Sequence, residues 1–121
     1  MNVLGLHLLL ELKECNPQLL DNLDHVRSAL YGAAEGVGAH IVGECFHQFS
    51  PQGVTGVLSI AESHISIHTW PEYNYAAADI FTCGSSFQPR DAAKVLIELF
   101  ESKQPEITEV RRGLLSLPVV I

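Results

Sequence analysis

Basic residues are scarce in this chain of 121 residues, which has seven lysines and arginines against fourteen aspartates and glutamates. The net charge of −7 argues against nucleic acid and against an anionic membrane surface as partners. Hydrophobic residues make up 47% of the chain, but charges interrupt every run before the roughly 20 apolar residues that a membrane span requires. Residues 1–5 lack the basic segment of a secretory signal, which favours a cytoplasmic protein.

Cysteines are also few. Cys15, Cys45 and Cys83 are too scattered for a disulfide framework or a CxxC metal site. No internal repeat, linker or low-complexity stretch divides the chain, so residues 1–121 are predicted to form one domain. A domain of this size has little surface left to enclose a large substrate alone, and we therefore expect a homodimer with shared sites.

The first third of the sequence shows two clear periodicities. Leucines at every second position from Leu4 to Leu12 predict a strand with one buried face. Asn16 as a cap and Pro17 at the first helical position predict the start of a long amphipathic helix. This helix is expected to end near Gly36 or Gly38.

Short strands alternate with turns in the rest of the chain. Strands are expected at 39–50, 54–60, 64–70 and 76–83, with turns at 51–53 and 71–74. A second helix is expected at 89–103, stopped by Pro105, then a strand at 106–112 and a tail, 114–121, that adds a strand or packs on a partner. Two helices and about six strands predict an α/β (α+β) two-layer sandwich, in which the helices cover one face of a mainly antiparallel sheet.

Residues 60–73 contain the most informative motif, IAESHISIHTWPEY. Together with Phe46-His47, Phe49 and the segment FTCG at 81–84, it resembles the small prokaryotic S-adenosylmethionine decarboxylases. These are self-processing pyruvoyl enzymes that supply aminopropyl groups for spermidine and other polyamines. The resemblance runs from about residue 5 to residue 84.

The resemblance implies that Ser63 rewrites its own backbone. Its hydroxyl attacks the carbonyl of Glu62, the amide becomes an ester, and elimination gives a dehydroalanine that hydrolyses to a pyruvoyl group with loss of ammonia. One proenzyme thus becomes a β chain, 1–62, and an α chain, 63–121. The pyruvoyl carbonyl then captures the substrate amine as a Schiff base, so no metal and no pyridoxal phosphate is expected.

Three further residues receive catalytic or supporting roles from the resemblance. His68 removes the α-proton of Ser63 during processing, a role that suits an imidazole near neutral pH. Cys83 returns a proton to the decarboxylated carbon, which suits a thiol that is mostly protonated at pH 7. Thr55 stands where the family usually has a serine near the scissile amide, and its extra methyl stiffens the side chain.

The resemblance also implies the substrate contacts. Phe49 matches an aromatic residue on which adenine stacks, Glu72 matches a carboxylate that accepts hydrogen bonds from the ribose, and Trp70 is expected in the pocket wall. The expected substrate is S-adenosylmethionine, and the expected assembly is a homodimer of two α and two β chains.

Alternation around the scissile bond raises a geometric question. In an unbroken strand Ser63 shares a face with Ile65, and His68 lies on the other face. For His68 to act near Ser63, the backbone has to turn or distort around Glu62. By pattern alone, an ordinary hairpin corner at residues 62–66 is the favoured interpretation, and the family resemblance reverses this preference.

Three alternatives remain open from the residues. A zinc site at His64 and His68 would require a helix there, since on a strand residues four apart lie roughly 13 Å apart. The same pyruvoyl chemistry can act on arginine or ornithine. A non-enzymatic dimer that binds a small regulatory ligand is compatible with the same fold.

Overall fold

Six strands within the described residues form one antiparallel sheet, in the order β2-β3-β4-β5-β1-β6. The structure is a computed structural model that describes residues 3–83 and 87–115. The predicted two-layer class is confirmed. The strands are β1 (Val3–Lys13), β2 (Ile41–Gln48), β3 (Val54–Ile60), β4 (Ser63–Trp70), β5 (Tyr75–Cys83) and β6 (Gln104–Leu114).

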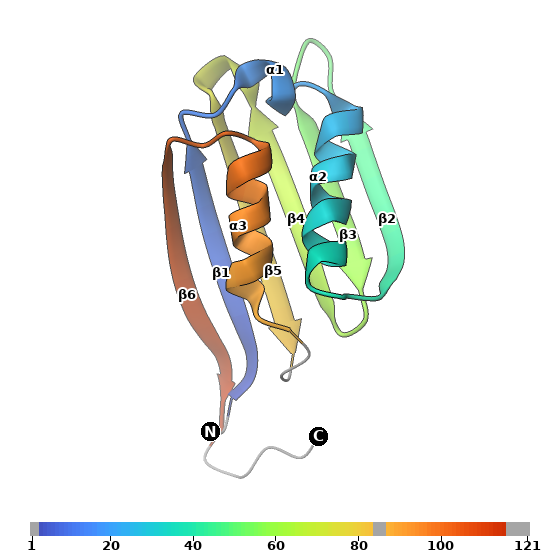
Figure 1. The fold of residues 1–121 in the computed structure, drawn as a ribbon, viewed down its shortest axis with the longest axis vertical. Coiled ribbons are helices and arrows are strands. Elements are labelled where there is room, and N and C mark those ends of the chain that lie inside the picture. Colours follow the sequence, from blue (N-terminus) through green and yellow to red (C-terminus); the bar gives the residue numbers. More distant parts are fainter. Residues whose placement is uncertain (1–2, 84–86, 116–121) are drawn as a thin grey trace.

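Helices cover one face of this sheet. Figure 1 shows α3 (Pro89–Leu99) in front of β1 and β5, and α2 (Leu23–Gly36) in front of β3 and its neighbours. Two single turns, α1 (Pro17–Leu20) and the 3₁₀ helix η1 (Pro71–Tyr73), lie at one end of the sheet. None of the described helices is both long and apolar enough to cross a bilayer.

The hydrophobic core lies between the sheet and the helices. Alternate residues of β1 and β4 point into it, which leaves Leu8, Leu10, Ile65 and Ile67 with at most 1% of their surface exposed. The remaining residues of these strands point to the opposite face, which we call the open face. On β4 the open face comprises His64, Ser66, His68 and Trp70, and no described element covers it.

The first predicted helix is interrupted in the structure. Asn16 caps α1 as predicted, since its side chain accepts a hydrogen bond from the backbone N–H of Gln18 at 3.0 Å. Asn22 then caps α2 by accepting from the N–H of His25 at 3.0 Å. The prediction of one continuous helix was wrong because this second cap starts a new helix, while the leucine spacing continues across the break.

The second predicted helix ends earlier than expected. α3 stops at Leu99, and Glu101 with a φ of 54° turns the chain back toward the sheet. Pro105 therefore does not stop the helix. It lies in β6, an edge strand, where a missing N–H is tolerated. The end of the predicted tail, 116–121, lies outside the described residues.

Candidate active site

The predicted scissile bond lies at a tight hairpin between β3 and β4. Ile60 and Ser63 are paired across the two strands, and Ala61 and Glu62 form the turn. The backbone N–H of Ala61 donates to the carbonyl of His40 at 2.9 Å, which fixes the hairpin end. Glu62 has a φ of 59°, in the left-handed region that costs a non-glycine residue roughly 1–2 kcal/mol. The predicted turn in the backbone is present immediately before Ser63.

Ser63 opens β4 with its side chain on the same face as Ile65, as an unbroken strand requires. Its Oγ is buried and has no hydrogen-bond partner among the described residues. Thr82 lies directly opposite on β5, and its Oγ1 is likewise buried and unpartnered. A buried hydroxyl without a partner costs roughly 1–3 kcal/mol, so both groups are unfavourable where β4 pairs with β5 beside the hairpin.

His68 does not meet Ser63 within one chain. The two residues are five positions apart on a regular strand, roughly 16 Å at about 3.3 Å per residue, and they point to opposite faces. The distortion at Glu62 does not change this, because β4 pairs regularly from Ser63 onward. His68 instead lies beside Thr55, its Nδ1 3.1 Å from the threonine Oγ1. The structure therefore joins His68 to Thr55 and separates both from the scissile bond.

A pocket of about 250 Å³ gathers the other predicted residues at the far end of β4. It is lined by side chains of the open face and the two adjoining turns: Phe49, Gln52, Thr55, His68, Trp70 and Glu72. The turn after β2 is closed by a hydrogen bond of 2.8 Å from the N–H of Phe49 to the carbonyl of Gly53. The pocket is slightly smaller than the roughly 300–1,000 Å³ of typical small-molecule sites.

Trp70 is held in the pocket wall by its neighbours. Its ring stacks on Tyr75 with a centroid distance of 5.4 Å and an interplanar angle of 29°. The phenol of Tyr75 donates to Glu11 at 2.8 Å, and burial together with this carboxylate raises the pKa of Tyr75 to about 12. Tyr75 stays protonated over the neutral range and keeps its hydrogen bond, which fixes the aromatic pair.

Cys83 lies at the Ser63 end of the sheet. It is the last residue of β5, points to the open face with Asp79 and Phe81, and follows Thr82, the partner of Ser63. In Figure 1 this end is opposite the turns that form the pocket. The predicted site residues thus form two groups, with Glu62, Ser63 and Cys83 at one end of the sheet and the pocket residues at the other.

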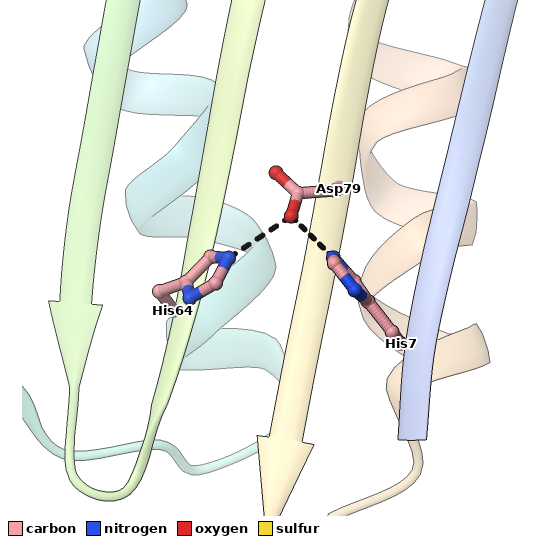
Figure 2. Close-up of side chains that lie close together, drawn as sticks. All are labelled: His7, His64 and Asp79. Atoms are coloured by element: carbon pink, nitrogen blue, oxygen red, sulfur yellow. Dashed lines mark hydrogen bonds and ion pairs between the residues drawn. The ribbon is translucent and has the colours of Figure 1, made fainter. Parts of the chain in front are cut away.

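A polar cluster on three neighbouring strands was not predicted from the sequence. Figure 2 shows His7 of β1 and His64 of β4 converging on Asp79 of β5, with Nε2–Oδ2 distances of 2.5 and 2.9 Å. Ser66 donates to the other oxygen of Asp79. Burial pushes the pKa of Asp79 upward, but the hydrogen bonds from Ser66, His7 and His64 outweigh it and hold this pKa below its ordinary value. A single carboxylate in the otherwise uncharged strand 76–83 was the available signal.

The geometry of the histidines argues against a shared metal ion. β4 is a strand, so His64 and His68 are too far apart to share an ion. The ligand atoms of His7, His64 and Asp79 do lie within 4.8 Å of one another. However, Arg112 Nη1 is 3.2 Å from Nδ1 of His7, and a guanidinium can only donate. Nδ1 of His7 is therefore the acceptor, and Nε2 bears the hydrogen and donates it to Asp79. The cluster is thus a hydrogen-bond network, since a metal would need Nε2 without its hydrogen.

Comparisons with known proteins agree with the resemblance seen in residues 60–84. Residues 6–113 match the family model described as S-adenosylmethionine decarboxylase. The chain is 52% identical to the S-adenosylmethionine decarboxylase proenzyme of Thermodesulfovibrio yellowstonii over 96% of this chain and 86% of the relative. It is 46% identical to the S-adenosylmethionine decarboxylase proenzyme of Acetivibrio thermocellus over 100% of this chain and 98% of the relative. The crystal structure of the adenosylmethionine decarboxylase from Aquifex aeolicus superposes with a TM-score of 0.90 at 31% identity, over the full length of both chains. This chain belongs to the S-adenosylmethionine decarboxylase family.

Proposed function

We propose that this protein is a pyruvoyl-dependent decarboxylase that converts S-adenosylmethionine to S-adenosylmethioninamine, the aminopropyl donor for spermidine. The observation that carries the proposal is Ser63, whose buried hydroxyl has no hydrogen-bond partner among residues 3–83 and 87–115 and which directly follows a left-handed residue at a hairpin. The relatives are named proenzymes, which supports self-processing, and their names supply the substrate.

Self-processing would use the strained hairpin. Ser63 Oγ adds to the carbonyl carbon of Glu62, and the C–N bond breaks as its nitrogen takes a proton, which leaves an ester. Removal of the α-proton of Ser63 then expels the Glu62 carboxylate, and water replaces the nitrogen as ammonia. Because Ser63 Oγ makes no hydrogen bond among the described residues, it does not have to give one up before the attack. The products are chains 1–62 and 63–121.

A second copy of the chain would complete each site. His68 lies roughly 16 Å along β4 from Ser63, so it does not reach the α-proton of its own chain. We propose a homodimer in which the open faces meet about a twofold axis. Such packing places the pocket of one copy over the Ser63 end of the other, and covers exposed side chains such as Leu9, Phe49 and Trp70. After processing, the dimer holds two α and two β chains.

Each remaining predicted residue has a place in this composite site. Phe49 and Trp70 offer aromatic faces for adenine, since both are about half exposed in the single chain. Glu72 offers a carboxylate for the ribose hydroxyls. Thr55, at 3.1 Å from His68, holds that imidazole in place.

The chemistry at the Ser63 end follows from two groups. The pyruvoyl group, once formed, withdraws electrons from the bound amino acid as CO2 leaves. Cys83, on the open face at this end, returns the proton to the α-carbon. The residues supply a source for the pyruvoyl group, so neither a metal nor pyridoxal phosphate is needed. We propose a cytoplasmic enzyme, and its net charge of −7 argues against nucleic-acid and anionic-membrane partners.

Intact mass under denaturing conditions tests the proposal. The enzyme should give two fragments, 1–62 and 63–121, the second lighter by one ammonia than simple hydrolysis predicts. A Ser63→Ala chain should stay whole. Release of CO2 from S-adenosylmethionine, arginine and ornithine, compared side by side, then identifies the substrate. A whole wild-type chain would instead favour a binding protein, and turnover of arginine or ornithine alone would refute the substrate.

A further inference from the structure

The cluster around Asp79 occupies the middle of the open face, next to the scissile hairpin. Asp79 is directly opposite Ser66 on β4 and reaches diagonally to His64 and His7, which are both opposite Phe81. The ring of Phe81 stacks on His64 with centroids 5.9 Å apart and meets the edge of His7 at 5.4 Å. These contacts hold both imidazoles against the sheet.

The hydrogens of the network are fixed by its donors. Arg112 donates to Nδ1 of His7, so the hydrogen of that ring is on Nε2 and points to Asp79 at 2.5 Å. An ionised carboxylate only accepts, so His64 also donates through Nε2, at 2.9 Å. With Ser66 included, three donors from two strands converge on one carboxylate.

The network spans the proposed cleavage point. Cleavage before Ser63 removes the turn that ties β4 to β3 and makes residue 63 a chain end, and chain ends fray unless they are tied down. His64 and Ser66 are the next residues of β4 on the open face, and both bind Asp79. Asp79 in turn binds His7, which belongs to the other fragment.

We propose that Asp79, oriented by His7 and Arg112, positions His64 and thereby the backbone of residue 63 for self-processing and for decarboxylation. The inference rests on the proposed function, since it concerns the residue that becomes the pyruvoyl group. His64, His7 and Asp79 act as positioning residues, because they hold the reacting residue through its neighbour. Charge-assisted hydrogen bonds suit this purpose, being shorter and stronger than neutral ones.

Two variants of His64 separate positioning from packing. The substitution His64→Gln keeps an N–H donor near the position of Nε2, whereas His64→Leu fills similar space without a donor. We expect Asp79→Asn and His64→Leu to lower the rate of self-cleavage and the kcat of the processed fraction roughly 10- to 100-fold, the loss seen in metal sites when the hydrogen-bond partner that orients a ligand is removed. His64→Gln should recover most of both rates.

Further measurements show whether the loss reflects positioning. KM should stay within about twofold of wild type, because the substrate pocket at the far end of β4 is untouched. Unfolding midpoints should shift by less than about 5 °C. Glu109→Gln, which removes an ion pair to Arg90 on the helix-covered side, is the matched control and should cleave at the wild-type rate.

The outcomes are distinguishable from failure of the proposed function. If wild type itself is never cut, the proposed function fails. If wild type matures but Asp79→Asn and His64→Leu mature and turn over at the same rates, the positioning role is refuted. Equal losses in His64→Gln and His64→Leu would also refute it. So would one equivalent of Zn²⁺ bound by wild type and not by Asp79→Asn, since a metal would need the nitrogens that here carry hydrogens.

Discussion

Complementation between two inactive chains is the sharpest test of a site built from two copies. One chain carries Ser63→Ala, which removes the reacting residue but keeps the pocket with His68. The other carries His68→Ala, which keeps Ser63 but loses the imidazole. Neither variant should mature alone, because every site in its homodimer lacks either Ser63 or His68. Within one chain these two residues are separated by roughly 16 Å of β4, so a complete site should form only between copies.

The expected recovery follows from symmetry. With equal expression and random pairing, half of the dimers contain one chain of each kind, and each mixed dimer has one complete site out of two. Activity should therefore reach about one quarter of wild type in the mixture and about one half in a mixed dimer purified through two different tags. In the purified mixed dimer, denaturing mass spectrometry should show the His68→Ala chain cut and the Ser63→Ala chain whole.

A second pair of variants provides the control. Cys83 lies at the same end of the sheet as Ser63, so Ser63→Ala and Cys83→Ala damage the same half of each site. Their mixed dimer should recover no decarboxylase activity. No recovery in the mixed dimer of His68→Ala with Ser63→Ala would refute the arrangement across two copies. Cleavage of the His68→Ala chain when expressed alone would refute the role of His68 in processing.

Three smaller perturbations test individual contacts. Gly5→Ala puts a Cβ 2.7 Å from the ring of Phe81, so urea denaturation should show the free energy of unfolding lowered by roughly 1–3 kcal/mol. Gly43→Ala, whose Cβ has its nearest contact at 3.9 Å, should lower it much less. Thr55→Val removes the hydroxyl bonded to the pocket imidazole and should slow self-cleavage in a mass-spectrometric time course, while Thr55→Ser should match wild type. The pKa of Asp79 in the folded protein lies below its ordinary value of 3.8, so the ionised carboxylate stabilises the fold above pH 3.8 and this stabilisation is lost as the pH falls through the lowered pKa. Asp79→Asn should therefore flatten this part of the acid-unfolding curve. An unchanged slope would contradict the lowered pKa.

Much of the fold was predictable because local signals and tertiary contacts agree. The alternation of leucines up to Leu12 and the residues of 54–60 gave strands close to those observed, since each has one face in the core. The helix break at Asn22 was missed because apolar spacing continues across it, and only the cap reveals the new start. The end of α3 was missed because Glu101 in a left-handed conformation has no sequence signature comparable to glycine.

The candidate site was predictable by residue type, but its division between two ends was not. The motif identified Ser63, His68 and Cys83, and the alternation already placed Ser63 and His68 on opposite faces of an unbroken strand. The expected distortion at Glu62 is present, but β4 is regular from Ser63 onward, so His68 stays at the other end of the strand. The Asp79 network was missed for a different reason. Its members are 15 and 72 positions apart in the chain, and they meet only because β5 lies between β4 and β1. Strand order is a property of the whole sheet and is not encoded in any local pattern.

Two unfavourable features border the same peptide bond, and the proposed cleavage would remove both. Glu62 is held at a φ of 59° only because the chain must continue into Ser63 within a two-residue turn. Once the bond is cut, Glu62 becomes a chain end and can leave the left-handed region. The hydroxyl of Ser63, buried without a partner among the described residues, is lost when that residue becomes a ketone. We infer that the backbone strain at Glu62 and the unsatisfied hydroxyl of Ser63 make the precursor less stable relative to the cleaved protein. The sheet pairing of Ser63 with Thr82 would then keep the new end in place while the strain is released.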